Sequence, residues 1–107
     1  MNNSTFEMQA DFYKAMGNAT RLQILYSLRE RSMKVGDIVH VTGLSQSIVS
    51  RQLSTLRSVG LVKFRRQGNE MIYRIADENT GKICDLVGKI LSTQVQRRSE
   101  AFEQGMP

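Results

Sequence analysis

The fold of this chain is decided by residues 35–60, which read VGDIVHVTGLSQSIVSRQLSTLRSVG. Apolar residues at helical spacing over residues 35–41 predict a short helix that stops at Gly43, where glycine suits a left-handed turn. Ser45 is then placed to cap a second helix that runs to Val59. A helix, a tight glycine turn and a further helix make the helix-turn-helix pattern.

A β-hairpin is predicted directly after this unit. Residues 61–66 and 70–75 are rich in Val, Phe, Ile and Tyr, and the Gly-Asn pair at 68–69 supplies the positive backbone angles of a tight turn. A two-residue turn places Lys63 opposite Arg74, and such like charges are tolerated where solvent or an anion lies against them. The other predicted pairs are Phe64 with Tyr73 and Val62 with Ile75.

Further helices are predicted on both sides of this unit. Residues 6–16 carry apolar side chains at helical spacing, and Asn18 or Thr20 can cap the helix that follows. A long final helix is expected from Asp77 to Phe102, with its apolar residues gathered near one stripe. The fold class is therefore mainly α, with about five helices and two antiparallel strands that form a wing.

The length of the chain favours a single winged helix-turn-helix domain over residues 1–107. Residues 18–76 form its expected DNA-binding core, and residues 5–16 and 77–103 its expected dimerisation helices. The apolar faces of these outer helices exceed what so small a core covers, which favours a two-fold dimer. In the alternative, the last helix folds back across its own domain in a monomer. The expected dimer interface consists of Met8, Phe12, Cys84, Val87, Leu91 and Val95.

The net charge of +5 is concentrated in one part of the chain. Residues 51–74, called the basic stretch below, contain one acid, Glu70, and the remainder of the chain has nine bases and nine acids. The bases of this stretch are Arg51, Arg57, Lys63, Arg65, Arg66 and Arg74. A local cationic surface on a helix and hairpin is typical of duplex binding, because each neutralised phosphate releases a counterion.

The helix over residues 45–59 has a polar stripe opposite its apolar one. Gln and Arg can make paired hydrogen bonds to adenine and guanine, and small hydroxyls let a helix approach base edges closely. A solvated polar side is common on any amphipathic helix, but a basic hairpin follows this one and favours DNA contact. The expected DNA-binding residues are Ser45, Gln46, Ser47, Ser50, Arg51, Ser54, Lys63, Arg65, Arg66, Gln67, Asn69 and Arg74.

Two other classes of function compete with DNA binding. A winged-helix adaptor could use the same basic surface to bind an acidic protein partner, although it would not need the polar stripe. An enzyme is not expected, because the sequence has no Gly-rich phosphate loop, no nucleophile and base pair and no clustered carboxylates. We also expect no cofactor.

Four runs of sequence together resemble the ArsR/SmtB repressors of bacteria, over about residues 12–76. The runs are NATRLQIL at 18–25, VGDI at 35–38, GLSQSIVSRQL at 43–53 and LRSVGLV at 56–62. The resemblance implies a dimeric winged helix-turn-helix repressor that leaves its operator when a metal, oxidant or other signal arrives. The two-fold dimer itself predicts that this operator is palindromic. The resemblance does not identify the signal, so the inducer is unknown.

The chain departs from the metal-sensing members of this family. Where members that sense arsenic or soft metals carry Cys-x-Cys, residues 33–37 read MKVGD, and the last helix lacks the histidines of zinc sensors. A closed zinc site needs about four ligands, whereas the chain has one Cys, Cys84, and one His, His40. We therefore expect no metal site, and we expect Cys84 to pack as a small apolar residue.

The cysteine count and the lack of long apolar segments also indicate the cellular compartment of the protein. A single cysteine excludes an internal disulfide and favours a reducing environment. No apolar run approaches the roughly 18 residues of a membrane span, and the first residues lack the pattern of a secretory signal. We expect a cytoplasmic protein without a membrane partner.

Overall fold

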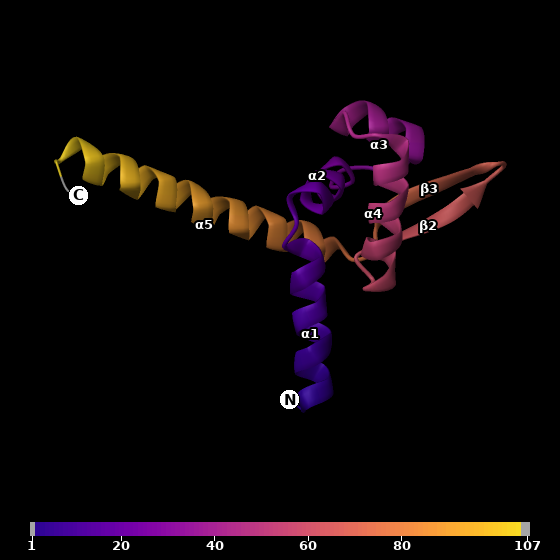
Figure 1. The fold of residues 1–107 in the computed structure, drawn as a ribbon, viewed down its shortest axis with the longest axis horizontal. Helices are drawn as coiled ribbons and strands as arrows, with labels where there is room; N and C mark the ends of the chain where they lie inside the picture. The colour runs from indigo at the N-terminus through magenta and orange to yellow at the C-terminus, as the bar shows by residue number, and fades with distance from the viewer. Residues whose placement is uncertain (1, 106–107) are drawn as a thin grey trace.

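The computed structural model describes residues 2–105 of the chain. Five helices and a small sheet alternate along the described sequence (Figure 1). In chain order the elements are α1 (Asn3–Met16), α2 (Ala19–Ser27), β1 (Met33–Lys34), α3 (Val35–Thr42), α4 (Gln46–Ser58), β2 (Val62–Gln67), β3 (Glu70–Ile75) and α5 (Glu78–Glu103). The predicted fold class, a mainly helical winged helix-turn-helix, is confirmed.

The hydrophobic core lies where α2, α3 and α4 meet the base of the sheet. Ile24, Ile38 and Leu53, one from each of these helices, are completely buried, and Val62 closes the core from the sheet side. Burying a side chain of this size stabilises the fold by about 1.5–3 kcal/mol. The core thus holds α4 by its apolar side and leaves the opposite side free.

The ends of the helices are set by local hydrogen bonds that the sequence predicted. The side chain of Asn18 accepts a hydrogen bond from the N–H of Arg21 at 3.0 Å, so Asn18 rather than Thr20 caps α2. Ser45 caps α4 in the same way. Between α3 and α4, Gly43 has φ +73°, a left-handed conformation that favours glycine. This turn fixes the angle at which α4 leaves α3.

The sheet has three antiparallel strands in the order β1-β3-β2. The predicted register of the hairpin is confirmed, with Lys63 opposite Arg74 and Phe64 opposite Tyr73. The expectation of two strands was wrong by one, because β1 adds to the edge of β3, with Met33 opposite Tyr73. A strand of two residues is too short to show the alternation by which strands are detected in a sequence.

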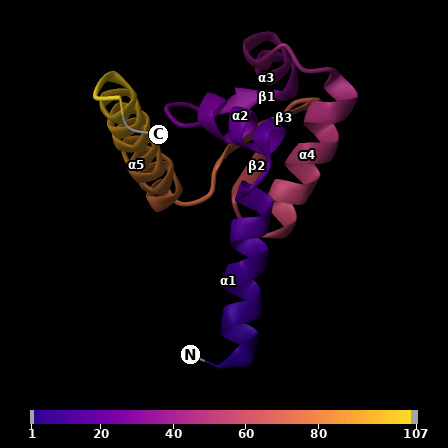
Figure 2. The ribbon, with the colours of Figure 1, turned by 60° about the vertical axis from the view of Figure 1, so that its left-hand side comes forward.

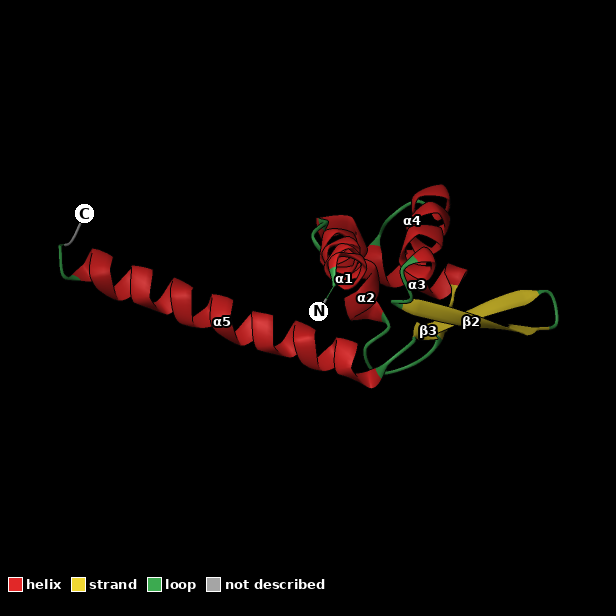
Figure 3. Ribbon diagram, turned by 90° about the horizontal axis from the view of Figure 1, so that it is seen from below, coloured by secondary structure: helices red, strands yellow, loops and turns green. Residues whose placement is uncertain are grey.

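The two outer helices leave the core in different directions (Figures 1 and 2). Seen from below, α5 and the hairpin extend toward opposite ends of the molecule (Figure 3). Only the first part of α5 is anchored, where Thr80 and Cys84 are buried and the Oη of Tyr26 donates a hydrogen bond to the carbonyl of Cys84 at 3.1 Å. Residues 89–100 of α5 are all exposed. Within residues 2–105, every helix is too short or too polar to cross a bilayer.

Candidate nucleic-acid interface

The outward side of α4 carries one continuous polar surface, which we call the reading face. It consists of four exposed residues, Ser47, Ser50, Arg51 and Ser54. On the opposite side of the helix, Val49, Leu53 and Leu56 have no exposed surface. Packing of these three side chains therefore decides which side of α4 faces outward. Gln46 is also exposed, in the first turn of the helix.

Ser45 differs from the other predicted contacts on this helix because its hydroxyl caps the helix. Its Oγ accepts a hydrogen bond from the N–H of Ile48 at 3.2 Å and lies 3.4 Å from the Oγ of Ser47. A cap of this kind stabilises a helix by about 1 kcal/mol. Ser45 thus has a structural role in holding the start of the reading face.

Arg57, near the end of α4, contacts the wing. The guanidinium carbon of Arg57 lies 4.9 Å from the centre of the Phe64 ring on β2. Phe64 in turn packs against Tyr73 on β3, with ring centres 5.5 Å apart. Contacts of this type between a cation and an aromatic face are worth about 0.5–1 kcal/mol at exposed sites. They connect the reading helix to the hairpin.

The tip of the hairpin is polar and exposed on both sides. Neighbouring residues of a strand point to opposite faces, so Arg65 and Arg66 present their guanidinium groups on the two sides of the ribbon. Arg65 also donates a hydrogen bond to the side-chain oxygen of Gln67 at 3.0 Å. Gly68 has φ +63° in the turn, but the exposed Asn69 beside it does not have a positive φ, so the prediction of positive backbone angles for this pair was right for Gly68 and wrong for Asn69. The tip therefore offers cations and amides in several directions.

The start of the reading helix and the tip of the wing meet at one open cleft. Gln46 and Asn69 both line this cleft, which has a volume of about 460 Å³. At its edge, the Nζ of Lys34 lies 3.5 Å from the carboxylate of Glu70, the one acid of the basic stretch. This exposed pair adds little stability, but it places a positive charge beside that carboxylate.

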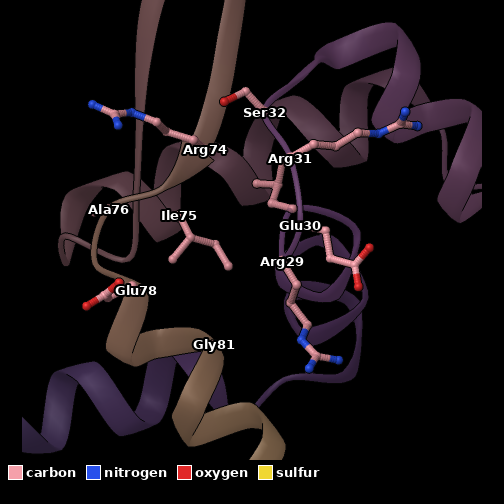
Figure 4. A pocket seen from close by; sticks show the side chains of 10 residues that line it. Arg29, Glu30, Arg31, Ser32, Arg74, Ile75, Ala76, Glu78 and Gly81 are labelled. Carbon is pink, nitrogen blue, oxygen red and sulfur yellow. The ribbon is translucent and has the colours of Figure 1, made fainter.

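Lys63 and Arg74 lie at the base of the hairpin, apart from the tip. Arg74 lines a cavity of about 360 Å³ between the wing base, the loop after α2 and the start of α5. Figure 4 shows Ile75 pointing into this cavity, whereas the head groups of Arg74 and Arg31 point away from it on opposite sides. The structure thus brings together Gln46 and the hairpin tip but keeps the Lys63 and Arg74 pair separate from them.

Comparison with known proteins assigns this arrangement to a family. Residues 18–63 match the model described as bacterial regulatory protein, arsR family. The HTH-type transcriptional regulator Rv0081 of Mycobacterium tuberculosis is 34% identical over 99 residues, which cover 92% of this chain and 87% of the relative. The chain belongs to the ArsR family. This membership confirms the interpretation as a transcriptional regulator rather than an enzyme, and nothing in the comparisons favours the adaptor.

Further similar proteins support the same assignment. The nodulation protein NolR of Rhizobium meliloti is 40% identical over 84 residues, covering 78% of this chain and 69% of the relative. The crystal structure of Rv0081 superposes with a TM-score of 0.82 at 33% identity, over 92% of this chain and 99% of that one. A homodimeric winged helix-turn-helix DNA-binding domain, Mb0332 of Mycobacterium bovis, also gives a TM-score of 0.82, at 31% identity over 91% and 93%.

The residues expected at the dimer interface fall into two groups. Four of them are exposed, with exposed fractions from 46% to 73%: Met8, Val87, Leu91 and Val95. Phe12 instead packs partly against the core of its own chain, and Cys84 is only 2% exposed. Burial raises the pKa of the Cys84 thiol, and the charge of Arg29 partly opposes that rise. Cys84 is thus held as a neutral thiol beside α2.

No metal cluster is found in the described part of this ArsR-family chain. Among residues 2–105, no three His, Cys, Asp or Glu side chains lie close enough together to hold a metal ion. His40 is exposed on α3, and Cys84 is buried on α5.

Sequence reasoning missed two contacts that position the reading face. One is the stacking of Arg57 on Phe64, and the other is a hydrogen bond from Arg21 to Gln52 on α4. Both join residues of different elements, so local pattern carries no signal for them. From the sequence, Arg57 is only one more charge of the basic stretch.

Proposed function

We propose that this ArsR-family protein is a homodimeric repressor that binds a palindromic operator. The observation that carries the proposal is the combination of an exposed polar face on α4 with a cationic hairpin attached to the same helix. The match to a family of bacterial regulatory proteins supports it. Repression requires only that the bound dimer occupies its operator until a signal lowers its affinity.

In this proposal the reading face enters the major groove. Arg51 is the residue suited to guanine, because its guanidinium can donate to two acceptors of that base. Gln46 is suited to adenine in the same way, and the hydroxyls of Ser47, Ser50 and Ser54 allow close approach to base edges. Ser45 contributes through the first turn of the helix. Each good paired contact discriminates between bases by about 1–3 kcal/mol.

The wing supplies contacts with the DNA backbone. Arg65, Arg66, Gln67 and Asn69 at the tip are exposed and reach away from the core, so they can follow the groove or its phosphates beside the reading helix. Lys63 and Arg74 are assigned to phosphate as well, from the base of the hairpin. Contacts of this kind add affinity for every sequence and make binding strongly dependent on salt.

The dimer is proposed to form through α1 and α5. Large apolar side chains on α5 remain exposed in the single chain, including Leu91 at 53% and Val95 at 64%, and a second copy would cover them. The homodimeric state of the related Mb0332 domain supports this assignment. A two-fold dimer presents its two reading helices about one turn of DNA apart, which matches an inverted repeat.

The inducer is proposed to be something other than a metal bound by Cys or His. The donor count supports this, since the chain has one Cys and one His and a closed zinc site needs about four ligands. Adding Zn²⁺ to the complex of protein and operator should therefore leave the DNA bound. Release of DNA by zinc, measured by fluorescence anisotropy, would overturn this part of the proposal.

The operator is the first thing to identify. Metal-free protein is used to select fragments from sheared genomic duplex, and the selected DNA is compared with scrambled DNA by anisotropy across a salt series. We expect an inverted repeat with strong preference and a salt slope that reports about five to ten phosphates. Equal, weak binding to every duplex would refute the repressor and favour the adaptor.

A pair of double variants tests the role of the wing. Arg65→Ala with Arg66→Ala should weaken binding to all sequences and lower the salt slope by about 2, since each phosphate contact contributes about 0.9. Lys89→Ala with Arg97→Ala removes the same charge from exposed positions on α5 and serves as the matched control. If the two double variants behave alike, the tip has no specific role.

A further inference from the structure

A single arginine at the start of α2 joins the outer helix α1 to the reading helix α4. The backbone of Arg21 is fixed first, because its N–H donates to the capping side chain of Asn18 at 3.0 Å. The point at which its side chain leaves α2 is therefore fixed. Arg21 is half-buried, so its guanidinium group lies between elements rather than in open solvent.

Two of the guanidinium nitrogens bind the end of α1. The Nε of Arg21 donates to the carbonyl of Ala15 at 2.6 Å, and one Nη donates to the carbonyl of Lys14 at 3.3 Å. The last carbonyls of a helix have no partner within that helix, and the helix dipole places negative charge there. A guanidinium group is suited to this position because it is cationic and carries several donors.

The remaining Nη of Arg21 binds α4. It donates to the Oε1 of Gln52 at 3.0 Å, across 31 positions of sequence. Gln52 is half-buried on the flank of α4 and lies outside the reading face. One rigid group therefore holds the end of α1 and the middle of the reading helix at the same time.

Besides Arg21, the contacts that hold α1 come from its last five residues, where Phe12 and Met16 pack partly against the core. Residues 3–11 of this helix are all exposed, and Ala15 near its end is its one buried side chain among the described residues. Because the helix is held near that end, the contacts made there decide the angle at which the remainder leaves the core.

We propose that Arg21 is a positioning residue that sets the angle between α1 and α4, and thereby the spacing of the two half-sites that the dimer accepts. The inference rests on the proposed function, in which α1 helps form the dimer and α4 reads the operator. A change of angle between these helices moves the two reading helices apart or together. Each half of the dimer still recognises its own half-site.

Lysine cannot replace arginine in this role. Its ammonium group keeps the positive charge but is a single point on a flexible stem, whereas the planar guanidinium holds several acceptors in a fixed geometry. Arg21→Lys therefore separates geometry from charge. Gln52→Ala removes the partner on α4, and Gln52→Glu keeps an oxygen acceptor for the guanidinium group.

The first test measures the angle without DNA. Spin labels are placed at Glu7→Cys on α1 and Ser54→Cys on α4, in a Cys84→Ser background, and labelled protein is diluted into excess unlabelled protein so that only distances within one chain are read. We expect one narrow distance distribution for the parent and for Gln52→Glu. Arg21→Lys and Gln52→Ala should broaden it by at least twofold. An unchanged distribution in both of these variants overturns the inference.

The second test measures the consequence on DNA. Affinities are compared for a single half-site, for the selected operator and for operators whose half-sites are one base pair closer or farther apart. The parent should prefer the selected spacing by at least tenfold, and Arg21→Lys and Gln52→Ala should lose most of that preference while half-site affinity changes less than twofold. Retained spacing preference in both variants overturns the inference.

The controls keep the two proposals distinguishable. Gln23→Ala removes an exposed side chain from the same helix as Arg21 and should leave both readouts unchanged. Urea unfolding and light scattering establish that each variant is folded and dimeric. If the parent shows no spacing preference at all, the proposed dimeric function fails on that result alone, while the spin-label distances still decide whether Arg21 sets the angle.

Discussion

Helices α4 and α5 are both amphipathic, but only α4 has its apolar side covered. In α4 the inward residues Val49, Leu53 and Leu56 have no exposed surface. Along the 26 residues of α5, only Thr80 and Cys84 are buried, while Leu91 and other large apolar side chains remain exposed. Within one chain, therefore, the apolar side of α4 is buried, and most of the apolar side of α5 is not. The apolar residues of α4 maintain the fold, and those of α5 are available for association.

The largest effect is expected from a change that weakens the core under α4. Leu53→Ala should lower the free energy of unfolding by about 2–5 kcal/mol, because it removes a fully buried side chain and leaves a cavity. Urea unfolding followed by circular dichroism measures the change. A loss below about 1 kcal/mol would mean that the core does not hold α4 as described.

The same kind of change on α5 should act on association instead. Leu91→Asp should leave the chain folded but raise the dissociation constant of the dimer by roughly 100-fold or more, because it places unpaired carboxylates in an apolar contact. Light scattering over a dilution series measures this. Gln96→Asp adds the same charge on the other side of α5 and is the matched control. A wild-type protein that is monomeric at micromolar concentration would refute the dimer itself.

The exposed side of α4 can be tested without disturbing its buried side. Arg51→Ala should weaken binding to the selected operator by about 1–3 kcal/mol and leave binding to scrambled DNA nearly unchanged. Arg51→Lys keeps the charge but not the paired donors, so it should lose most of the same preference. Anisotropy on both duplexes measures the difference. Equal losses on both would assign Arg51 to phosphate rather than to bases.

The smallest expected effect comes from Cys84, the buried thiol of α5. Burial raises its pKa above the ordinary value of 9.0, so the folded state holds the proton more tightly than the unfolded state. The resulting stability is fully present below pH 9.0 and is lost as pH rises through the folded value. Urea unfolding at several pH values should show a steeper decline in wild type than in Cys84→Ala. Identical slopes would mean that the thiol is not buried.

Local signals in the sequence were sufficient for the elements that form the reading surface. The cap at Ser45, the glycine at Gly43 and the hairpin register are each decided within a few residues, and all were predicted correctly. Strand β1 was missed because two residues carry no periodicity. The hydrogen bond between Arg21 and Gln52 could not be predicted, since it depends on how α2 packs against α4.

The prediction of the dimer interface shows the same limit of local sequence signals. Periodicity identifies the apolar side of a helix, but it does not say what covers that side. Cys84 and Val87 are three positions apart on α5, yet the first is 2% exposed and the second 46%. The difference depends on which side of α5 faces α2, which only the tertiary structure determines.

In the proposed dimer, the exposed apolar side of α5 also makes the protein's behaviour depend on its own concentration. A core closed within one chain unfolds with a midpoint that does not change on dilution, whereas pairing through α5 follows mass action. When chains are scarce, the number of dimers rises with the square of the number of chains. Operator occupancy would then respond more steeply to synthesis of the protein than it would for a regulator that works as a monomer.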